Sequence, residues 1–118
     1  MKAQAIRAQN PQIWDKINKV FSEVKDLMDN SVWAQIGYLN IHRYGIDIET
    51  RTYIDKEPVL IRMEYVAAND EFKLNKVSIS MIRPLDKEIR EAFKEIAKIN
   101  GYETIELDSY IIALKELH

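Results

Sequence analysis

The stretch GIDIETRTYIDKEPVLIRMEYV, residues 45 to 66, decides the fold class of this 118-residue chain. Polar and apolar side chains alternate along it with a period of two, on both sides of a turn signal at residues 55–58. Such alternation is typical of strands that have one buried and one solvated face. We therefore predict two antiparallel strands here. The charged residues on their solvated face are Asp47, Glu49, Arg51, Arg62 and Glu64.

The neighbouring segments extend these two strands into a meander. AAND at residues 67–70 supplies turn chemistry, and FKLNKVSISMI at residues 72–82 predicts a third strand. Upstream, the aromatic and β-branched residues of 33–41 favour a further strand, with a short helix capped by Ser31 as the alternative. The meander is therefore expected to hold three or four strands.

Two amphipathic helices are predicted on either side of the meander. In residues 10–30, Pro11 stands at the first helical position behind Asn10 as N-cap, and apolar residues recur at helical spacing. In residues 84–101 a second stripe ends at Gly101. Its members are Leu85, Ile89, Ala92, Phe93, Ile96 and Ile99. Packing both stripes on one face of the sheet gives an α+β fold, with residues 1–118 as a single domain.

The last segments predict a final strand and a short C-terminal helix. YETIEL at residues 102–107 is expected to be a strand with Ile105 and Leu107 facing inward. For residues 108–118 we favour a helix, because Ile111, Leu114 and Leu117 recur every third residue. The alternative is the return arm of a hairpin.

The composition excludes several classes of function. Seventeen basic and 19 acidic residues give a net charge of −2, which offers no general attraction for nucleic acid or anionic lipid. The absence of cysteine excludes disulfides, thiolate metal sites and cysteine nucleophiles. No apolar run has the length of a signal peptide or a membrane span. We expect a soluble cytoplasmic protein that does not bind membranes and that would need a local basic patch to bind nucleic acid.

Carboxylates on the solvated face are the best candidates for a metal site. We expect four of them to converge at one end of the meander beside Lys73, where carboxylate oxygens are the ligands that magnesium prefers. They are Asp47, Glu49, Glu64 and Glu71. Any sheet with one solvated face displays alternating charge, however. The leading interpretation is therefore a solvated surface in which Arg51, Arg62 and Lys73 interleave with the acids.

The α-β-β-β-α-β order, together with Glu71-Phe72-Lys73, resembles the core of the PD-(D/E)xK nucleases. The resemblance implies a magnesium-dependent nuclease whose ligands are the carboxylates above. Here the Glu-x-Lys tripeptide lies at a turn, and no Pro-Asp precedes it. The nuclease is accordingly kept as an alternative function.

Residues from Val77 to the end are similar to the second half of the GNAT family of N-acetyltransferases, in which a strand, a helix, a Gly-Tyr turn, a strand and a final helix follow in that order. That family holds the acetyl-CoA pyrophosphate on a glycine-rich turn that opens the helix. The corresponding turn here, residues 83–87, has no glycine, and Pro84 removes one donor. We therefore assign no cofactor.

The exposed tyrosines point to a protein partner, because tyrosine on the outer side of a sheet often anchors one. His42 is the only internal histidine and has no recognisable nucleophile near it in sequence. The expected partner-binding residues are Tyr38, His42, Tyr44, Arg51, Tyr53 and Arg62.

These observations favour a non-enzymatic binding or regulatory protein, such as an inhibitor, an immunity-type protein or an accessory subunit. Besides the nuclease, the other alternative is a small-ligand pocket between the sheet and the helices. If residues 33–41 form an uncovered edge strand, that strand could pair with its equivalent in a homodimer.

Overall fold

The fold is that of a computed structural model, which describes residues 11–30, 38–54, 57–82 and 86–117. Its elements in chain order are α2 (Pro11–Asn30), β1 (Tyr38–His42), β2 (Gly45–Ile54), β3 (Glu57–Ala68), β4 (Glu71–Ile82), α3 (Lys87–Ile99), β5 (Glu103–Glu106) and β6 (Tyr110–Glu116). The predicted α+β class, with a helix, a meander, a second helix and a final strand, is confirmed.

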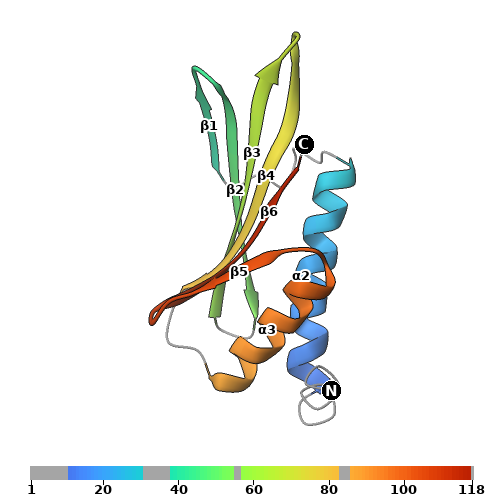
Figure 1. The fold of residues 1–118 in the computed structure, drawn as a ribbon, viewed down its shortest axis with the longest axis vertical. Helices are drawn as coiled ribbons and strands as arrows, with labels where there is room; N and C mark the ends of the chain where they lie inside the picture. Colours follow the sequence, from blue (N-terminus) through green and yellow to red (C-terminus); the bar gives the residue numbers. More distant parts are fainter. Residues whose placement is uncertain (1–10, 31–37, 55–56, 83–85, 118) are drawn as a thin grey trace.

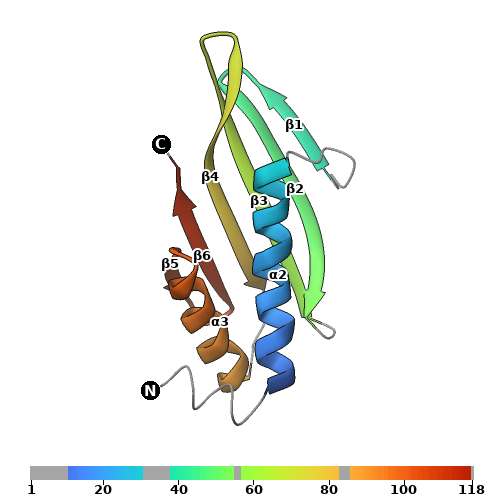
Figure 2. The same ribbon diagram turned by 90° about the vertical axis from the view of Figure 1, so that its right-hand side faces the viewer.

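The strands form one antiparallel sheet in the order β1-β2-β3-β4-β6-β5. Both helices lie on the same face of this sheet (Figures 1 and 2). The molecule is elongated, with extents of 49 × 25 × 25 Å. The β1-β2 and β3-β4 hairpins reach past the end of α2 (Figure 1). We call the face that carries the helices the inner face and the opposite one the outer face.

One hydrophobic core lies between the helices and the inner face. Trp14, Phe21 and Val24 of α2 are buried, as their helical spacing predicts. From the sheet, the fully buried residues include Val59, Val77, Ile79, Met81, Ile111 and Ala113. The stripe of α3 is buried over most of its length, but Ile99 in its last turn is 67% exposed, so its predicted inward position is wrong. In the part of the chain that the structure describes, no helix is long and apolar enough to cross a membrane.

The predicted C-terminal helix is wrong, and the hairpin alternative is correct. Residues 110–116 form β6, which inserts between β4 and β5. Ile111 and Ala113 face the core, whereas Ile112 and Leu114, which alternate with them along the strand, lie on the outer face. Because β6 is apolar on both faces, its sequence lacks the alternation that would have marked it as a strand.

The insertion of β6 also reverses the predicted orientation of β5. Ile105 pairs with Ile112 and therefore lies on the outer face, where it is 48% exposed. Leu107 is 45% exposed. Thr104 pairs with the buried Ala113 and so lies on the inner face, where it is nevertheless exposed. The prediction that Ile105 and Leu107 face inward is wrong.

Local sequence explains two of the turns. Asn69 and Asp70 have φ angles of 52° and 65° and form the two-residue loop between β3 and β4, as in a type I′ turn. Gly101, with φ of 83°, ends α3 as predicted. The N–H groups of Tyr102 and Gly101 donate to the carbonyls of Ala97 and Lys98, which is the Schellman pattern.

Some expectations lie outside the described residues. They concern the Asn10 cap, residues 33–37 of the expected upstream strand, the Ser31 cap of the alternative helix, and Leu85. Within the described part, β1 begins at Tyr38 and ends at His42.

Candidate functional site

The predicted site residues of β2 and β3 lie on the outer face. The buried residues of these strands lie on the inner face, where for example Ile48 pairs with Met63 across the two strands. The charged residues alternate with them, so Asp47 lies opposite Glu64 and Glu49 lies opposite Arg62. Because no described helix covers this face, these side chains are available for contacts with other molecules (Figure 2).

Opposite charges interleave along this face, and of the three predicted cations Arg62 takes part. Arg62 lies 3.6 Å from Asp47 and 3.5 Å from Glu49, measured between nitrogen and carboxylate oxygen. Lys76 of β4, which the sequence analysis did not single out, lies 3.9 Å from Glu64. Together with His42 these residues form what we call the charged band: His42, Asp47, Glu49, Arg62, Glu64 and Lys76. Its pairs are partly exposed, so each stabilises the fold by only about 0–1 kcal/mol.

His42 is held by contacts at both ring nitrogens. Its Nδ1 accepts a hydrogen bond from the N–H of Tyr44 at 3.3 Å, and its Nε2 lies 3.4 Å from Asp47. An accepting Nδ1 places the proton of the neutral ring on Nε2, which faces the carboxylate. Tyr44 itself is 70% exposed at the β1-β2 turn, with the guanidinium of Arg43 5.7 Å from its ring centre.

Glu71 does not join the other carboxylates, so the predicted convergence is wrong for this residue. Glu71 pairs with Ala68, four residues beyond Glu64 along β3, which corresponds to about 13 Å at ~3.3 Å per residue. Lys73 pairs with Val66, two residues beyond Glu64. Among the described residues, no group of three or more acidic or histidine side chains is placed to hold a metal ion.

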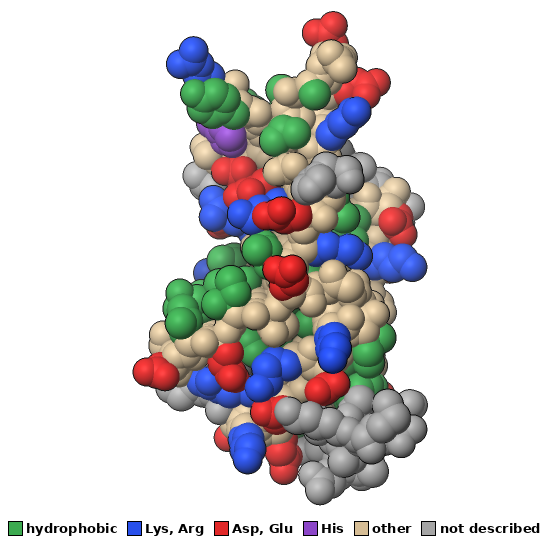
Figure 3. Space-filling model, in the orientation of Figure 1, with side chains coloured by type: hydrophobic (Ala, Val, Ile, Leu, Met, Phe, Trp, Pro, Cys, Tyr) green, Lys and Arg blue, Asp and Glu red, His purple; other side chains and the backbone are tan. Residues whose placement is uncertain are grey.

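An apolar surface covers the other end of the outer face. We call it the outer apolar patch: Tyr53, Pro58, Leu60, Ile82, Ile105, Leu107, Tyr110, Ile112 and Leu114. The most exposed members are Tyr53 at 59% and Ile82 at 51%. The patch is continuous at the strand ends, since Pro58 pairs with Tyr53, shares a depression with Ile82, and Ile82 pairs with Tyr110. Farther along β4, Ser80 lies between Leu60 and Ile112. In Figure 3 hydrophobic side chains gather on the left flank, with charged side chains above them.

The patch contains a depression of about 240 Å³. It is lined by Arg51, Pro58, Leu60 and Ile82, which come from the ends of β2, β3 and β4. Three of these residues are apolar, and Arg51 supplies one exposed cation. Such a depression can receive an apolar side chain that has an acidic group beside it.

Helix α3 fixes the hairpin that carries half of the patch. The guanidinium of Arg90 donates to the carbonyls of Leu107 and Asp108, at 3.4 and 2.8 Å, and lies 3.5 Å from Glu106. Lys94 also reaches Glu106 at 3.5 Å, and its hydrogen bond to Glu91 raises the pKa of its ammonium group. The β5-β6 turn is thereby anchored to the helix.

Some residues of the outer face could be predicted from the sequence, and others could not. Arg51, Tyr53 and Arg62 lie on the outer face as expected, and the backbone of Tyr38 pairs with that of Glu49. The half of the patch on β5 and β6 was missed, because residues 108–118 were expected to be helical. The number of apolar residues in that segment could have indicated an apolar outer face, because a strand with one buried face needs fewer of them.

Comparisons with protein-family models, with curated proteins and with solved structures find no match to this chain.

Proposed function

We propose that the protein is a non-enzymatic binding protein whose outer face docks a protein partner. The observation that carries this proposal is the outer apolar patch, which spans five strands on a face that no described element covers. Soluble domains seldom leave contiguous apolar side chains in water unless a partner covers them. An inhibitor, an immunity-type protein or an accessory subunit would act in this way.

The chemistry of the patch indicates what the partner presents. The depression beside Ile82 suits an apolar side chain, and aromatic side chains often dominate the binding energy at interfaces. Arg51 at its rim favours a neighbouring carboxylate on the partner. The partner therefore presents an apolar side chain next to an acidic residue.

The charged band contributes orientation more than affinity. Arg62 already pairs with Asp47 and Glu49 within the protein, so a partner group must compete for them. Charges at the border of an apolar contact mainly determine which partner docks and in which orientation. His42 and Tyr44 lie at the far end of the band and would meet only a partner that extends beyond the patch.

The cytoplasm is the compartment that we propose for this function, because the chain has no cysteine and needs no oxidising environment.

A second copy of the chain is the alternative partner. β1 is an edge strand of five residues, and the backbone of an edge strand can pair with its equivalent in a homodimer.

Site-specific photo-crosslinking in the native host tests the proposal. A photoreactive amino acid replaces Tyr53 or Ile82 in the patch, and Ile99 serves as the matched control because it is exposed and apolar but lies on α3. We expect one defined crosslinked protein from positions 53 and 82 and none from 99. The variant Ile82→Asp should abolish crosslinking at position 53, whereas Ile99→Asp should leave it intact.

Two outcomes would contradict the docking of a partner on the patch. Equal crosslinking from all three positions would mean that the contact is non-specific, and no crosslink at positions 53 and 82 would mean that the patch is not covered. A crosslinked product of twice the protein's own mass would identify a second copy of the chain as the occupant. Light scattering of the purified protein would then give the oligomeric state.

A further inference from the structure

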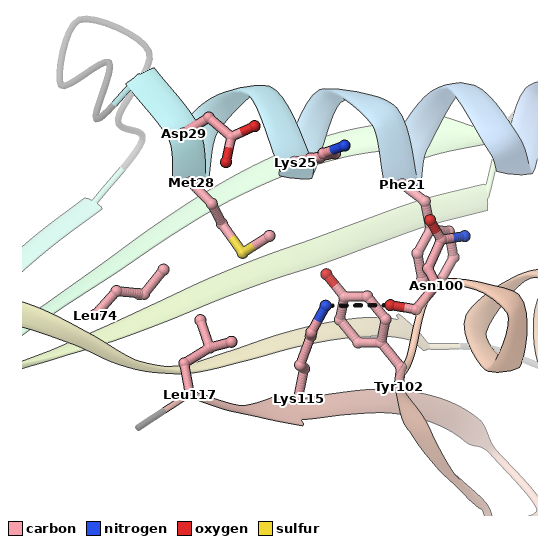
Figure 4. Close-up of a pocket in the computed structure, with 9 residues that line it drawn as sticks. All are labelled: Phe21, Lys25, Met28, Asp29, Leu74, Asn100, Tyr102, Lys115 and Leu117. Atoms are coloured by element: carbon pink, nitrogen blue, oxygen red, sulfur yellow. Dashed lines mark hydrogen bonds between the residues drawn. The ribbon is translucent and has the colours of Figure 1, made fainter.

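A pocket of about 450 Å³ opens on the helix side of the sheet, beneath the last turns of α2. This volume lies within the range of about 300–1,000 Å³ that is usual for small-molecule sites. The residues that line it are Phe21, Lys25, Met28, Asp29, Leu74, Asn100, Tyr102, Lys115 and Leu117 (Figure 4). They come from α2, β4, β6 and the turn after α3.

Fixed backbone contacts shape two walls of the pocket. The Schellman turn at Gly101 brings Tyr102 back against α3, where the residue is buried and its ring centre lies 5.2 Å from that of Phe21. The N–H of Leu117 donates to the carbonyl of Asn75 at 2.8 Å. Asn75 is the extra residue where the β3-β4 register shifts, so this bond ties the end of β6 to a bulge in β4.

The pocket has an apolar half and a polar half. Met28, Leu74 and Leu117 are partly buried and lie together at one end (Figure 4). At the other end the ammonium group of Lys115 lies 5.3 Å from the ring centre of Tyr102, whose hydroxyl points into the pocket (Figure 4). The arrangement fits a ligand that has a hydrocarbon part and one polar head.

The charges of the pocket select an anionic head. Lys115 donates one hydrogen bond to the carbonyl of Asn100 at 3.2 Å, and an ammonium group has two further donors. Lys25 adds a second cation from α2, whereas Asp29 is the one acidic residue among the described residues of the lining. In Figure 4 Asp29 lies above Met28, toward the apolar end and away from Tyr102. The described lining residues therefore carry a net charge of +1, which matches a singly charged anion.

We propose that this pocket binds a monocarboxylate with an unbranched alkyl chain, as in a medium-chain fatty acid. The alkyl chain lies along Met28, Leu74 and Leu117, where the flexible thioether of Met28 adapts to its shape. The carboxylate accepts hydrogen bonds from the ammonium group of Lys115 and from the hydroxyl of Tyr102. Burial raises the pKa of Tyr102 to about 12, so the hydroxyl keeps its proton and remains a donor at neutral pH.

This site is independent of the proposed docking surface, because it lies on the helix side of the sheet and shares no residue with the outer apolar patch. Failure of one proposal therefore leaves the other standing. The two can be tested on the same purified protein.

Calorimetric titration with decanoate and with decanol tests the inference. Both have the same hydrocarbon chain, but only decanoate carries the charge. We expect saturable binding of decanoate to the wild type and weaker binding of decanol. The variant Lys115→Met keeps the apolar stem and removes the ammonium group, so it should weaken decanoate binding about tenfold or more and leave decanol binding unchanged.

A conservative variant and a matched control accompany this experiment. Tyr102→Phe keeps the ring that packs on Phe21 and should weaken decanoate binding several-fold. Lys87→Met removes an exposed cation at the opposite end of α3 and should change nothing. In the wild type, the amide resonances of Gly101 and Leu117 should shift saturably as decanoate is added. The inference is overturned if these resonances do not shift at millimolar decanoate, or if Lys115→Met weakens decanoate and decanol binding equally.

Discussion

Replacing Phe21 by alanine tests how the two helices are held on the sheet. The ring of Phe21 is 3% exposed and lies between the helices and the turn after α3. Its centre is 5.5 Å from that of Phe93, with an interplanar angle of 60°, and it meets the Tyr102 ring edge-on at 85°. Alanine would remove both ring contacts and leave a cavity in the core.

The expected loss of stability in Phe21→Ala follows from these contacts. Truncating a buried phenylalanine to alanine costs about 3–5 kcal/mol, and the cost is smaller where the surroundings can relax into the space. Phe21 also lines the pocket beneath α2, so one side of the new cavity opens toward solvent. We therefore expect a loss of about 3–4 kcal/mol in the free energy of unfolding. Phe21→Leu keeps most of the volume but loses both aromatic pairs, and should cost about 1–2 kcal/mol.

Urea unfolding followed by circular dichroism measures both values. The dependence of the free energy on urea should stay unchanged, since both variants expose the same surface on unfolding. Tyr53→Ala is the matched control, because this aromatic residue is 59% exposed and its loss should change stability by less than about 0.5 kcal/mol. A loss below about 1 kcal/mol for Phe21→Ala would refute the packing argument, since it would mean that the stripe of α2 faces a partner instead.

Three further changes test other parts of the structure. Replacing Asp47, Glu49 and Glu71 together by their amides should change stability by less than about 1 kcal/mol. Calorimetric titration of the wild type with magnesium and manganese should show no saturable site, and a site that the triple variant loses would favour the nuclease alternative. Asp70→Gly should raise the urea midpoint, because glycine adopts the φ of 65° without the strain of a side chain. The pKa of Tyr102 is raised from 10.0 to about 12, so the unfolded chain ionises first and stability should fall as the pH rises from 10 to 12. Unfolding of Tyr102→Phe in urea at both pH values should show a smaller fall, and an equal fall would contradict the assignment.

The sequence predicted the elements whose periodicity was strong. The alternation in residues 45–66 identified β2 and β3, and the stripe from Trp14 to Val24 identified α2 and its buried face. Gly101 ended α3 as expected, because a helix commonly stops at a residue with positive φ. In each case one local pattern and one buried face were sufficient.

Where two faces of an element are apolar, the sequence misled. The strand β6 is buried on its inner face and contributes Ile112 and Leu114 to the patch on its outer face, so its apolar residues fit a helical spacing as well as a strand. The predicted position of Glu71 was wrong for another reason. The β3-β4 hairpin continues four residues past Glu64, and the length of a hairpin depends on pairing that no single strand encodes.

The position of β6 between β4 and β5 has a consequence for how the sheet is assembled during synthesis. Until residues 110–116 have emerged from the ribosome, β4 presents a long unpaired edge and β5 has no strand beside it. The helix α3 likewise lacks the buried Ile111 and Ala113 that complete the core beneath it. A nascent chain that stops before Tyr110 therefore exposes an edge on which other chains can aggregate. We expect such a chain to depend on chaperones until the strand that joins β4 to β5 has been made.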